Sequence, residues 1–332
     1  MKLKLIPDYN KEVDTVFLVS PLGLRDSAWG DFVKFLKVIL SIIKEKNKEQ
    51  KIVICCYFDS VEKTESLLCE EGIKNNDVIR LLSLTILDIW IRDYFSCANI
   101  DLGGEIGVLK AVYAPNYNQL ASVDDAAGQC LAQTFFEKVI NIPLKLDGGN
   151  VICNSEYVFI SEKLYTENIG ISKKEIDKFF EENFEQKLIT LPTEVLDVVG
   201  HTDCILRFLD DKTIALPIYD SEYKIDNRYV MNIKRILSEK LGLDYKFVFL
   251  PSYLDDSIND GNIFSARGLY LNYFRFEDHI IFPEFTDLGY YQNRIIENMR
   301  KYAPDIKIHF SSCDDIAFYG GCFNCISNFK YR

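Results

Sequence analysis

The chain has 332 residues, 48% of them hydrophobic and 13% aromatic, and a formal net charge of −12 at pH 7. This charge argues against sequence-independent binding to nucleic acid, which needs a positive face to replace the counterions of the phosphates. No run of about eighteen or more apolar residues predicts a membrane span, and the first residues, MKLKLIPDYN, lack the apolar stretch of a secretory signal.

We therefore expect a soluble, globular, cytoplasmic protein that contacts neither nucleic acid nor a membrane. The surplus of carboxylates suits a small cationic partner, and it also suits a surface that is merely well solvated. Ten cysteines fit a reducing compartment, and Cys55 and Cys56 lie within an apolar run as core residues would.

Short β-rich runs alternate with longer helical ones, which is typical of an α/β protein. In chain order, the pattern predicts a strand at 13–20, an amphipathic helix at 32–45, a buried strand at 51–58 and a helix at 61–72 that ends at Gly72. Further helices are predicted at 171–186, 229–243 and 289–304, each followed by a strand, at 187–192, 246–251 and 306–310. Two tight strand pairs are predicted at 203–217 and 269–283.

No Pro/Gly/Ser-rich linker and no low-complexity segment divides the chain. We therefore expect a single domain over residues 1–332. The recurring helix, strand and hairpin indicates several similar modules, although the sequence has no exact period.

The segment 320–325, GGCFNC, places Cys325 after paired glycines, where the backbone can approach a ligand closely. The residues alone leave four interpretations of Cys325 open: a core thiol, a redox pair with Cys322, a zinc ligand and a nucleophile. The chain has no second C-x-x-C motif, which argues against zinc.

Two other segments carry polar groups at close spacing. In GHTD, 200–203, an extended backbone would project His201 and Asp203 to the same face, although a surface hydrogen bond explains this pair equally well. In DIWIRD, 88–93, a strand ending at Trp90 would let Asp93 turn into a cleft, and a charged turn anchored by the tryptophan is the alternative.

DGGN, 147–150, predicts a tight turn that enters a strand at 151–161. Alone it carries little chemistry.

Together and in this order, the segments resemble the motifs of the agmatine deiminase and bacterial peptidylarginine deiminase family of guanidine-modifying enzymes. DIWIRD resembles the W-x-R-D motif, LDGGN the [DE]-G-G motif, GHTDCILRF the G-H-x-D-x-x-x-R-F motif, and GGCFNCIS the glycine-rich cysteine loop. The segment 269–283 resembles the hairpin before that loop. These matches span most of the chain.

The resemblance implies a five-bladed α/β propeller, the pentein fold, with an active site in its central channel. It also implies five catalytic residues. Cys325 would be the nucleophile and His201 the general acid and base, Asp93 and Asp203 would hold the guanidinium, and Asp147 would orient the histidine. Trp90 would contact the apolar stem of the substrate, and the other predicted substrate contacts are Asn150, Asn272 and Gly321.

The implied reaction is hydrolysis of a guanidine through a covalent S-alkylthiouronium on the cysteine, with no metal and no cofactor. Agmatine, giving N-carbamoylputrescine and ammonia, is the first candidate substrate. The alternatives are the arginine side chain of a protein, amidine transfer to an amine, a silent guanidinium-binding module and a redox protein that uses Cys322 with Cys325. A homo-oligomer also stays open.

The sequence departs from typical agmatine deiminases at several places. Their cysteine loop has a histidine where this chain has Asn324, and Tyr94 and Phe95 follow the R-D pair in place of a T-G-P turn. We therefore expect a divergent branch, in which the reaction type is conserved better than the substrate. Glu194 and Asp197 are candidates for binding an amine at the far end of the substrate.

Overall fold

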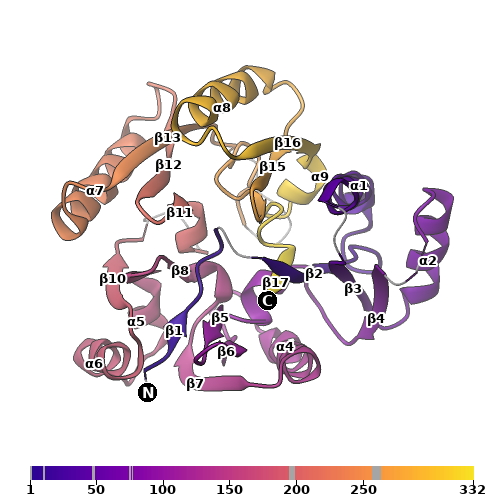
Figure 1. Ribbon diagram of the computed structural model, residues 1–332, viewed down its shortest axis with the longest axis horizontal. Helices are drawn as coiled ribbons and strands as arrows, with labels where there is room; N and C mark the ends of the chain where they lie inside the picture. The colour runs from indigo at the N-terminus through magenta and orange to yellow at the C-terminus, as the bar shows by residue number, and fades with distance from the viewer. Residues whose placement is uncertain are drawn as a thin grey trace.

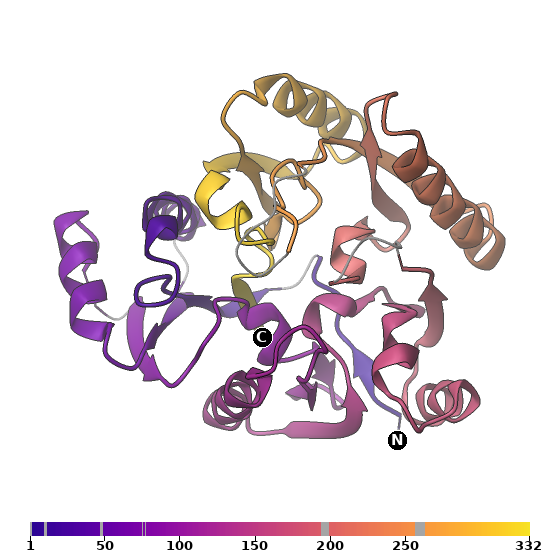
Figure 2. The ribbon, with the colours of Figure 1, turned by 180° about the vertical axis from the view of Figure 1, so that it is seen from behind.

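The structure is a computed structural model that describes residues 2–9, 12–46, 49–74, 76, 78–193, 199–255 and 263–332. The strands within these ranges form five small sheets. Figures 1 and 2 show the sheets grouped around a common centre, with the longer helices on the outside. This arrangement confirms the predicted mixed α/β class.

Four of the sheets share one plan, in which an antiparallel strand pair is followed by a helix and then by a strand parallel to the second strand of the pair. The first sheet contains β5 (Ala98–Asp101), β6 (Ile106–Val112), α4 (Ala121–Phe135) and β7 (Val139–Lys145), with β1 (Lys4–Leu5) added beside β5. The second contains β8 (Ile152–Cys153), β9 (Tyr157–Ser161), α5 (Lys163–Glu167), α6 (Lys173–Asn183) and β10 (Lys187–Leu191).

The third and fourth sheets repeat the plan with single long helices. The third contains β11 (Arg207–Asp210), β12 (Thr213–Tyr219), α7 (Lys224–Leu241) and β13 (Lys246–Ser252). The fourth contains β14 (Phe274–Phe276), β15 (His279–Glu284), α8 (Gly289–Tyr302) and β16 (Lys307–Ser312). The predicted strand pairs at 203–217 and 269–283 are thus confirmed, as are the three helices and the strands that follow them.

The fifth sheet joins the two ends of the chain. It has the order β17 (Ser327–Tyr331), β2 (Val13–Val19), β3 (Lys51–Tyr57) and β4 (Ile79–Leu84), with α1 (Trp29–Lys46) and α2 (Val61–Glu70) between its parallel strands. β17 runs antiparallel to β2, with Ser327 opposite Leu18. This pairing brings Cys325, two residues before β17, to the centre of the molecule.

The remaining elements are short and lie close to the predicted motifs. They are η1 (Asp26–Ala28), α3 (Ile91–Tyr94), η2 (Gly148–Asn150), η3 (Thr202–Cys204) and α9 (Asp314–Ala317).

Aromatic packing anchors the cysteine loop to the core. Phe323, in that loop, is fully buried and stacks on Phe35 of α1 with ring centroids 4.2 Å apart and an interplanar angle of 5°. The other side of Phe35 meets Phe274 of β14 edge-on at 5.0 Å. Helix α1 and the fourth sheet together therefore fix the loop that carries Cys325.

One local prediction is wrong, and two of the local conformations considered above are not present. The segment 151–161 is two strands, β8 and β9, because the Asn154 side chain accepts hydrogen bonds from the N–H groups of Glu156 and Tyr157 and forms a turn. DIWIRD is not extended: α3 begins at Ile91 and the Asp93 N–H donates to the Trp90 carbonyl at 3.0 Å. The segment after His201 is likewise the 3₁₀-helix η3.

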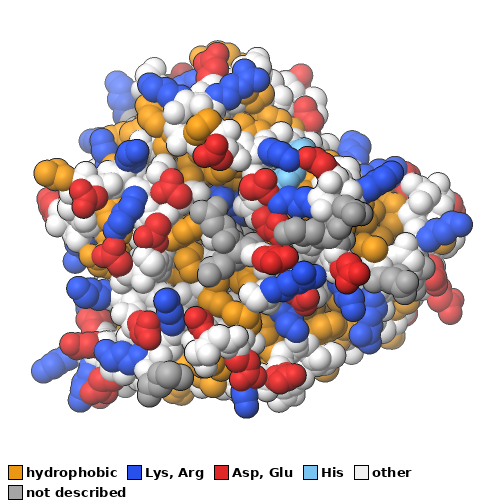
Figure 3. All heavy atoms as spheres, viewed as in Figure 1, with side chains coloured by type: hydrophobic (Ala, Val, Ile, Leu, Met, Phe, Trp, Pro, Cys, Tyr) orange, Lys and Arg blue, Asp and Glu red, His pale blue; other side chains and the backbone are white. Residues whose placement is uncertain are grey.

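On the face drawn in Figure 3, the Lys and Arg side chains of the described residues are interspersed with those of Asp and Glu. Within the described ranges, no helix combines the length and the apolar character needed to cross a membrane.

Candidate active site

The five predicted catalytic residues come from different parts of the fold and meet at its centre. Each is at most 7% exposed, and the set is Asp93 on α3, Asp147 before η2, His201 before η3, Asp203 within η3 and Cys325 before β17. All five thus lie in short helical turns or loops, and the neighbouring strands hold these irregular segments in place.

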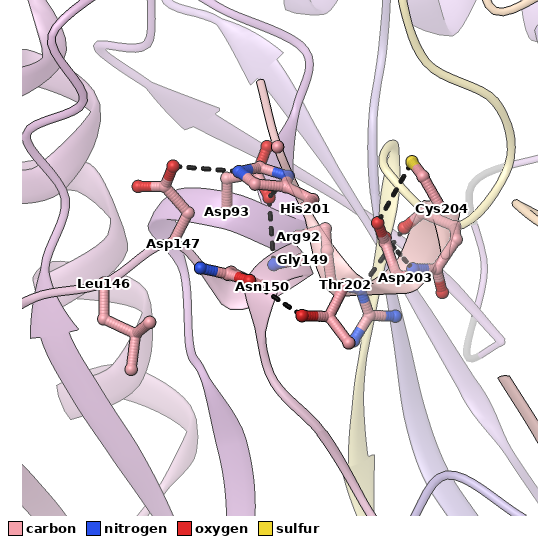
Figure 4. Close-up of polar contacts among 12 residues, drawn as sticks. Arg92, Asp93, Leu146, Asp147, Gly149, Asn150, His201, Thr202, Asp203 and Cys204 are labelled. Atoms are coloured by element: carbon pink, nitrogen blue, oxygen red, sulfur yellow. Dashed lines mark hydrogen bonds and ion pairs between the residues drawn. The ribbon is translucent and has the colours of Figure 1, made fainter. Parts of the chain in front are cut away.

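Three of these side chains converge on one backbone position, Gly149. A methyl group there would lie 2.7 Å from Asp93 Oδ1, 2.7 Å from His201 Nδ1 and 3.3 Å from Asp203 Oδ2. The Gly149 N–H donates to Asp93 Oδ1 at 3.0 Å (Figure 4). A glycine is needed here because any side chain would enter the space that the three polar groups share.

His201 lies between two carboxylates. Its Nε2 is 2.9 Å from Asp147 Oδ2 and its Nδ1 is 3.5 Å from Asp93 Oδ1 (Figure 4). Burial opposes protonation of the imidazole, but the charges of Asp93 and Asp147 outweigh it and raise the pKa of His201 to about 9. The imidazolium is therefore the stable form at neutral pH.

The two carboxylates respond differently to the same environment. Burial, reinforced by Asp147 and Asp203 and opposed by His201, raises the pKa of Asp93 to about 7. Burial also acts on Asp147, but the hydrogen bond from His201 and the charge of Lys163 prevail and lower its pKa to about 2.

Asp203 is held by the cysteine loop itself. Its Oδ2 accepts a hydrogen bond from Asn324 Nδ2 at 2.6 Å and one from Asn272 Nδ2 at 3.4 Å. Asn324 directly precedes Cys325, and Asn272 Oδ1 accepts from the Cys322 N–H at 3.1 Å. The loop that carries the thiol and the carboxylate of Asp203 therefore form one hydrogen-bonded unit.

Trp90 and Gly321 flank the thiol. A methyl group at Gly321 would lie 2.7 Å from Trp90 Cζ3 and 3.0 Å from Cys325 Cβ, so the indole packs directly beside the cysteine loop. Burial, followed by the charges of Asp203 and Asp93, raises the pKa of the Cys325 thiol well above its usual value. The thiol is therefore protonated at neutral pH.

Asn150 holds the frame together. Its side-chain oxygen accepts hydrogen bonds from the Ser161 N–H at 2.9 Å and from Thr202 Oγ1 at 2.8 Å. It thereby ties the end of β9 to the start of η3. Its contact with a substrate stays a prediction.

Both Cys322 and Cys325 are free thiols, and Cys322 has hydrogen-bond partners of its own. Its thiol donates to the Ala266 carbonyl at 3.6 Å and forms a hydrogen bond with the Cys313 thiol. The described part of the chain has no group of three or more His, Cys, Asp or Glu side chains placed to hold a metal ion. Glu194 and Asp197 lie outside the described residues.

Sequence reasoning missed Lys163, which is 7% exposed and reaches the same cluster. Its ammonium lies 2.6 Å from Asp147 Oδ2 and 3.4 Å from His201 Nε2. No motif includes this lysine. The only feature of the sequence that could have indicated it is its position two residues after the strand predicted at 151–161.

The comparisons with known proteins agree with this geometry. The family model described as Porphyromonas-type peptidyl-arginine deiminase matches residues 7–329. The chain belongs to this family. The predicted resemblance to the agmatine deiminase and peptidylarginine deiminase family is confirmed. The prediction of a guanidine-modifying hydrolase with a cysteine nucleophile is confirmed with it. Among curated protein sequences, none matches this member of the family.

Solved structures share the fold of this peptidyl-arginine deiminase family member at low sequence identity. An agmatine deiminase from C. jejuni is 20% identical, with a TM-score of 0.78, and the match covers 99% of this chain and 96% of the other. An agmatine deiminase of Enterococcus faecalis is 15% identical, with a TM-score of 0.81 and the same coverage. DDAH from Pseudomonas aeruginosa, a dimethylarginine dimethylaminohydrolase, is 12% identical over 96% of this chain and 100% of its own, with a TM-score of 0.54.

Proposed function

We propose that this protein hydrolyses the guanidine group of a small cationic molecule, with agmatine as the first candidate. The products would be N-carbamoylputrescine and ammonia. The observation that carries the proposal is the convergence of Asp93, His201 and Asp203 at Gly149, with the charges of Asp203 and Asp93 acting on the buried thiol of Cys325.

Binding comes first in the proposed cycle. A guanidinium is planar and presents five N–H donors, so the carboxylates of Asp93 and Asp203 would accept paired, charge-assisted hydrogen bonds from its edges. Trp90, packed beside the cysteine loop, would cover the apolar stem of the substrate.

Binding would also activate the nucleophile. The carboxylates that now raise the pKa of the Cys325 thiol would be neutralised by the guanidinium, and the added positive charge stabilises a thiolate. The reactive form of the cysteine would therefore arise only when a cation is in place.

The chemistry would then use His201 first as a proton donor and later as a proton acceptor. The Cys325 thiolate attacks the guanidinium carbon, His201 donates its proton to the leaving amine, and ammonia departs from the tetrahedral adduct. The resulting S-alkylthiouronium is attacked by a water whose proton passes to His201. Collapse of that adduct releases the ureido product and returns the thiol, so the path uses only side chains and water.

The burial of the site favours a small substrate. The reactive side chains are at most 7% exposed, so a free guanidine reaches them more easily than an arginine in a folded protein. The description of the matching family favours arginine in a peptide as the second candidate. We further propose that the chain is one cytoplasmic domain, residues 1–332, and that its five sheets are the blades of a five-bladed α/β propeller.

A substrate panel tests the proposal. Purified protein is incubated with agmatine, arginine, methylated arginines and arginyl peptides, and both ammonia and the guanidine-derived product are quantified. We expect ammonia and a ureido product from agmatine, and neither from the Cys325→Ala variant. A new guanidine instead would indicate amidine transfer, and inertness toward the whole panel would leave the binding-module alternative.

A further inference from the structure

One charged side chain at the centre of the molecule has no part in the cycle above. Lys163 opens α5 and is 7% exposed. Its ammonium contacts Asp147 at 2.6 Å, His201 at 3.4 Å and Glu167 at 3.6 Å, and it lies 4.8 Å from the centre of the Tyr117 ring. A lysine this deeply buried needs carboxylate partners, and here the nearest one also binds the histidine.

One oxygen atom of Asp147 serves both cations. Oδ2 lies 2.9 Å from His201 Nε2 and 2.6 Å from Lys163 Nζ. Oδ1 of the same carboxylate is buried and has no hydrogen-bond partner among the described residues. The ammonium and the imidazole therefore share the same acceptor.

The frame around Lys163 fixes this arrangement in place. Ser161, the last residue of β9, donates from Oγ to the Gly200 carbonyl at 2.6 Å and from its N–H to Asn150 Oδ1 at 2.9 Å. The strand end that carries Lys163 is thus bonded to the residue directly before His201. The backbone segments that carry the two cations are therefore held close together.

We propose that Lys163 is a positioning residue, which fixes the Asp147 carboxylate and keeps His201 able to release its proton. The inference rests on the proposed function, in which His201 must first donate a proton and later accept one. A histidine held only by carboxylates would keep its proton too tightly for the first of these steps.

The charged and titratable groups facing His201 come from five parts of the fold. They are Asp93 on α3, Asp147 before η2, Asp203 on η3, Lys163 and Glu167 on α5, and the thiol of Cys325 before β17. The carboxylates favour the imidazolium, whereas burial and the like charge of Lys163 oppose it. Removing the ammonium should therefore raise the pKa of His201 further.

A purely structural lysine would behave differently. If Lys163 served only as a counter-ion that stabilises the fold, replacing it would lower stability and leave the titration of His201 unchanged. The titration separates these two roles because it needs no substrate.

The experiment follows the imidazole resonances of the full-length protein by NMR as the pH is varied. The chain has three histidines, and the His201→Asn spectrum assigns the resonance of interest. Lys163→Met removes the charge, Lys163→Gln keeps a hydrogen-bond donor and serves if the methionine variant does not fold, and Lys163→Arg restores the charge. Lys110→Met is the matched control, because Lys110 is 3% exposed and paired with Asp125 outside the site.

We expect the pKa of His201 to rise by about one unit in Lys163→Met and Lys163→Gln, which corresponds to a roughly tenfold loss of neutral imidazole at a given pH below it. Lys163→Arg and Lys110→Met should titrate like the wild type. With a substrate from the panel, the fall in kcat/KM near pH 9 should move up by about one pH unit in the uncharged variants, because His201 would keep its proton to a higher pH.

An unchanged His201 titration in a folded, uncharged variant would overturn the inference. So would a loss of kcat by the same factor at every pH. A wild-type protein that is inert toward every guanidine would instead contradict the proposed function, and the titration would still decide the role of Lys163.

Discussion

At the scale of single residues, the site is a set of charges that shift one another. Burial alone would protonate the carboxylates and deprotonate the histidine, yet the imidazole between Asp93 and Asp147 retains its proton to a pKa of about 9. The site thus combines an imidazolium with a protonated thiol.

The pH dependence of kcat/KM follows from these shifts, because this ratio reports on ionisations of the free enzyme. Activity should rise as Asp93 ionises near pH 7 and fall as His201 loses its proton near pH 9, which gives a bell between those values. Steady-state rates from pH 5 to 10 test this prediction.

Asp88 provides the control for the acidic limb. Burial raises its pKa to about 6, and its carboxylate lies 4.0 Å from Arg25. Asp88→Asn should keep the limb near pH 7. If the acidic limb moved in this variant, the limb would report the ionisation of Asp88 and its assignment to Asp93 would be wrong.

Asn324 is the second residue-scale prediction. Asn324→Ala removes the 2.6 Å hydrogen bond to Asp203, and a hydrogen bond to a charged group is worth about 1.5–3 kcal/mol. We expect kcat/KM to fall by roughly 10- to 100-fold, mainly through KM, since Asp203 would no longer be held for the guanidinium.

Asn154→Ala is the comparison. Asn154 is fully buried and bonds Tyr245 at 2.8 Å in the turn between β8 and β9, away from the site. That variant should lose stability and keep its KM. Equal kinetic losses in both variants would argue against the role given to Asn324.

At the scale of elements, the sequence predicts the regular parts well and the irregular ones poorly. The hairpin at 269–283 and helices such as α8 carry clear apolar periods, so their positions follow from burial. The turns η2 and η3 are only three residues long and have no period. Their form depends on Gly149 and on the Asn150 hydrogen bonds, which only the folded chain supplies.

The same limit applies to the site. Motifs led to Asp93, His201 and Cys325, because their neighbours in sequence are distinctive. Lys163 reaches the cluster from the start of helix α5, and its contact with Asp147 depends on tertiary packing alone.

Phe323 tests how an element holds the nucleophile. Phe323→Ala would leave a cavity against Phe35 and should cost about 3–5 kcal/mol in the free energy of unfolding. We also expect lower kcat in the folded fraction, because the loop before Cys325 would lose its anchor.

Phe180→Ala is the matched change in a remote core. Phe180 of α6 is 1% exposed and stacks on Phe184 with centroids 5.0 Å apart. Denaturant unfolding should give a similar loss, with kcat per folded molecule retained. Normal kcat in Phe323→Ala would show that the loop is positioned by other contacts.

At the scale of the whole molecule, the chain ends complete the fold. β17 pairs with β2 across the two termini and thereby delivers Cys325 to side chains from the other sheets. We expect one cooperative unfolding transition, seen at the same denaturant concentration by far-UV and near-UV circular dichroism. Two separated transitions would contradict a single domain.

The central claim is covalent catalysis by Cys325 on a guanidine. Protein mixed with the active member of the substrate panel is quenched in acid during turnover, digested, and analysed by mass spectrometry. The account predicts an adduct on the peptide that carries Cys325, with the mass of the substrate less ammonia, and its absence from Cys325→Ala. Turnover without this adduct, or with the adduct on another cysteine, would contradict it.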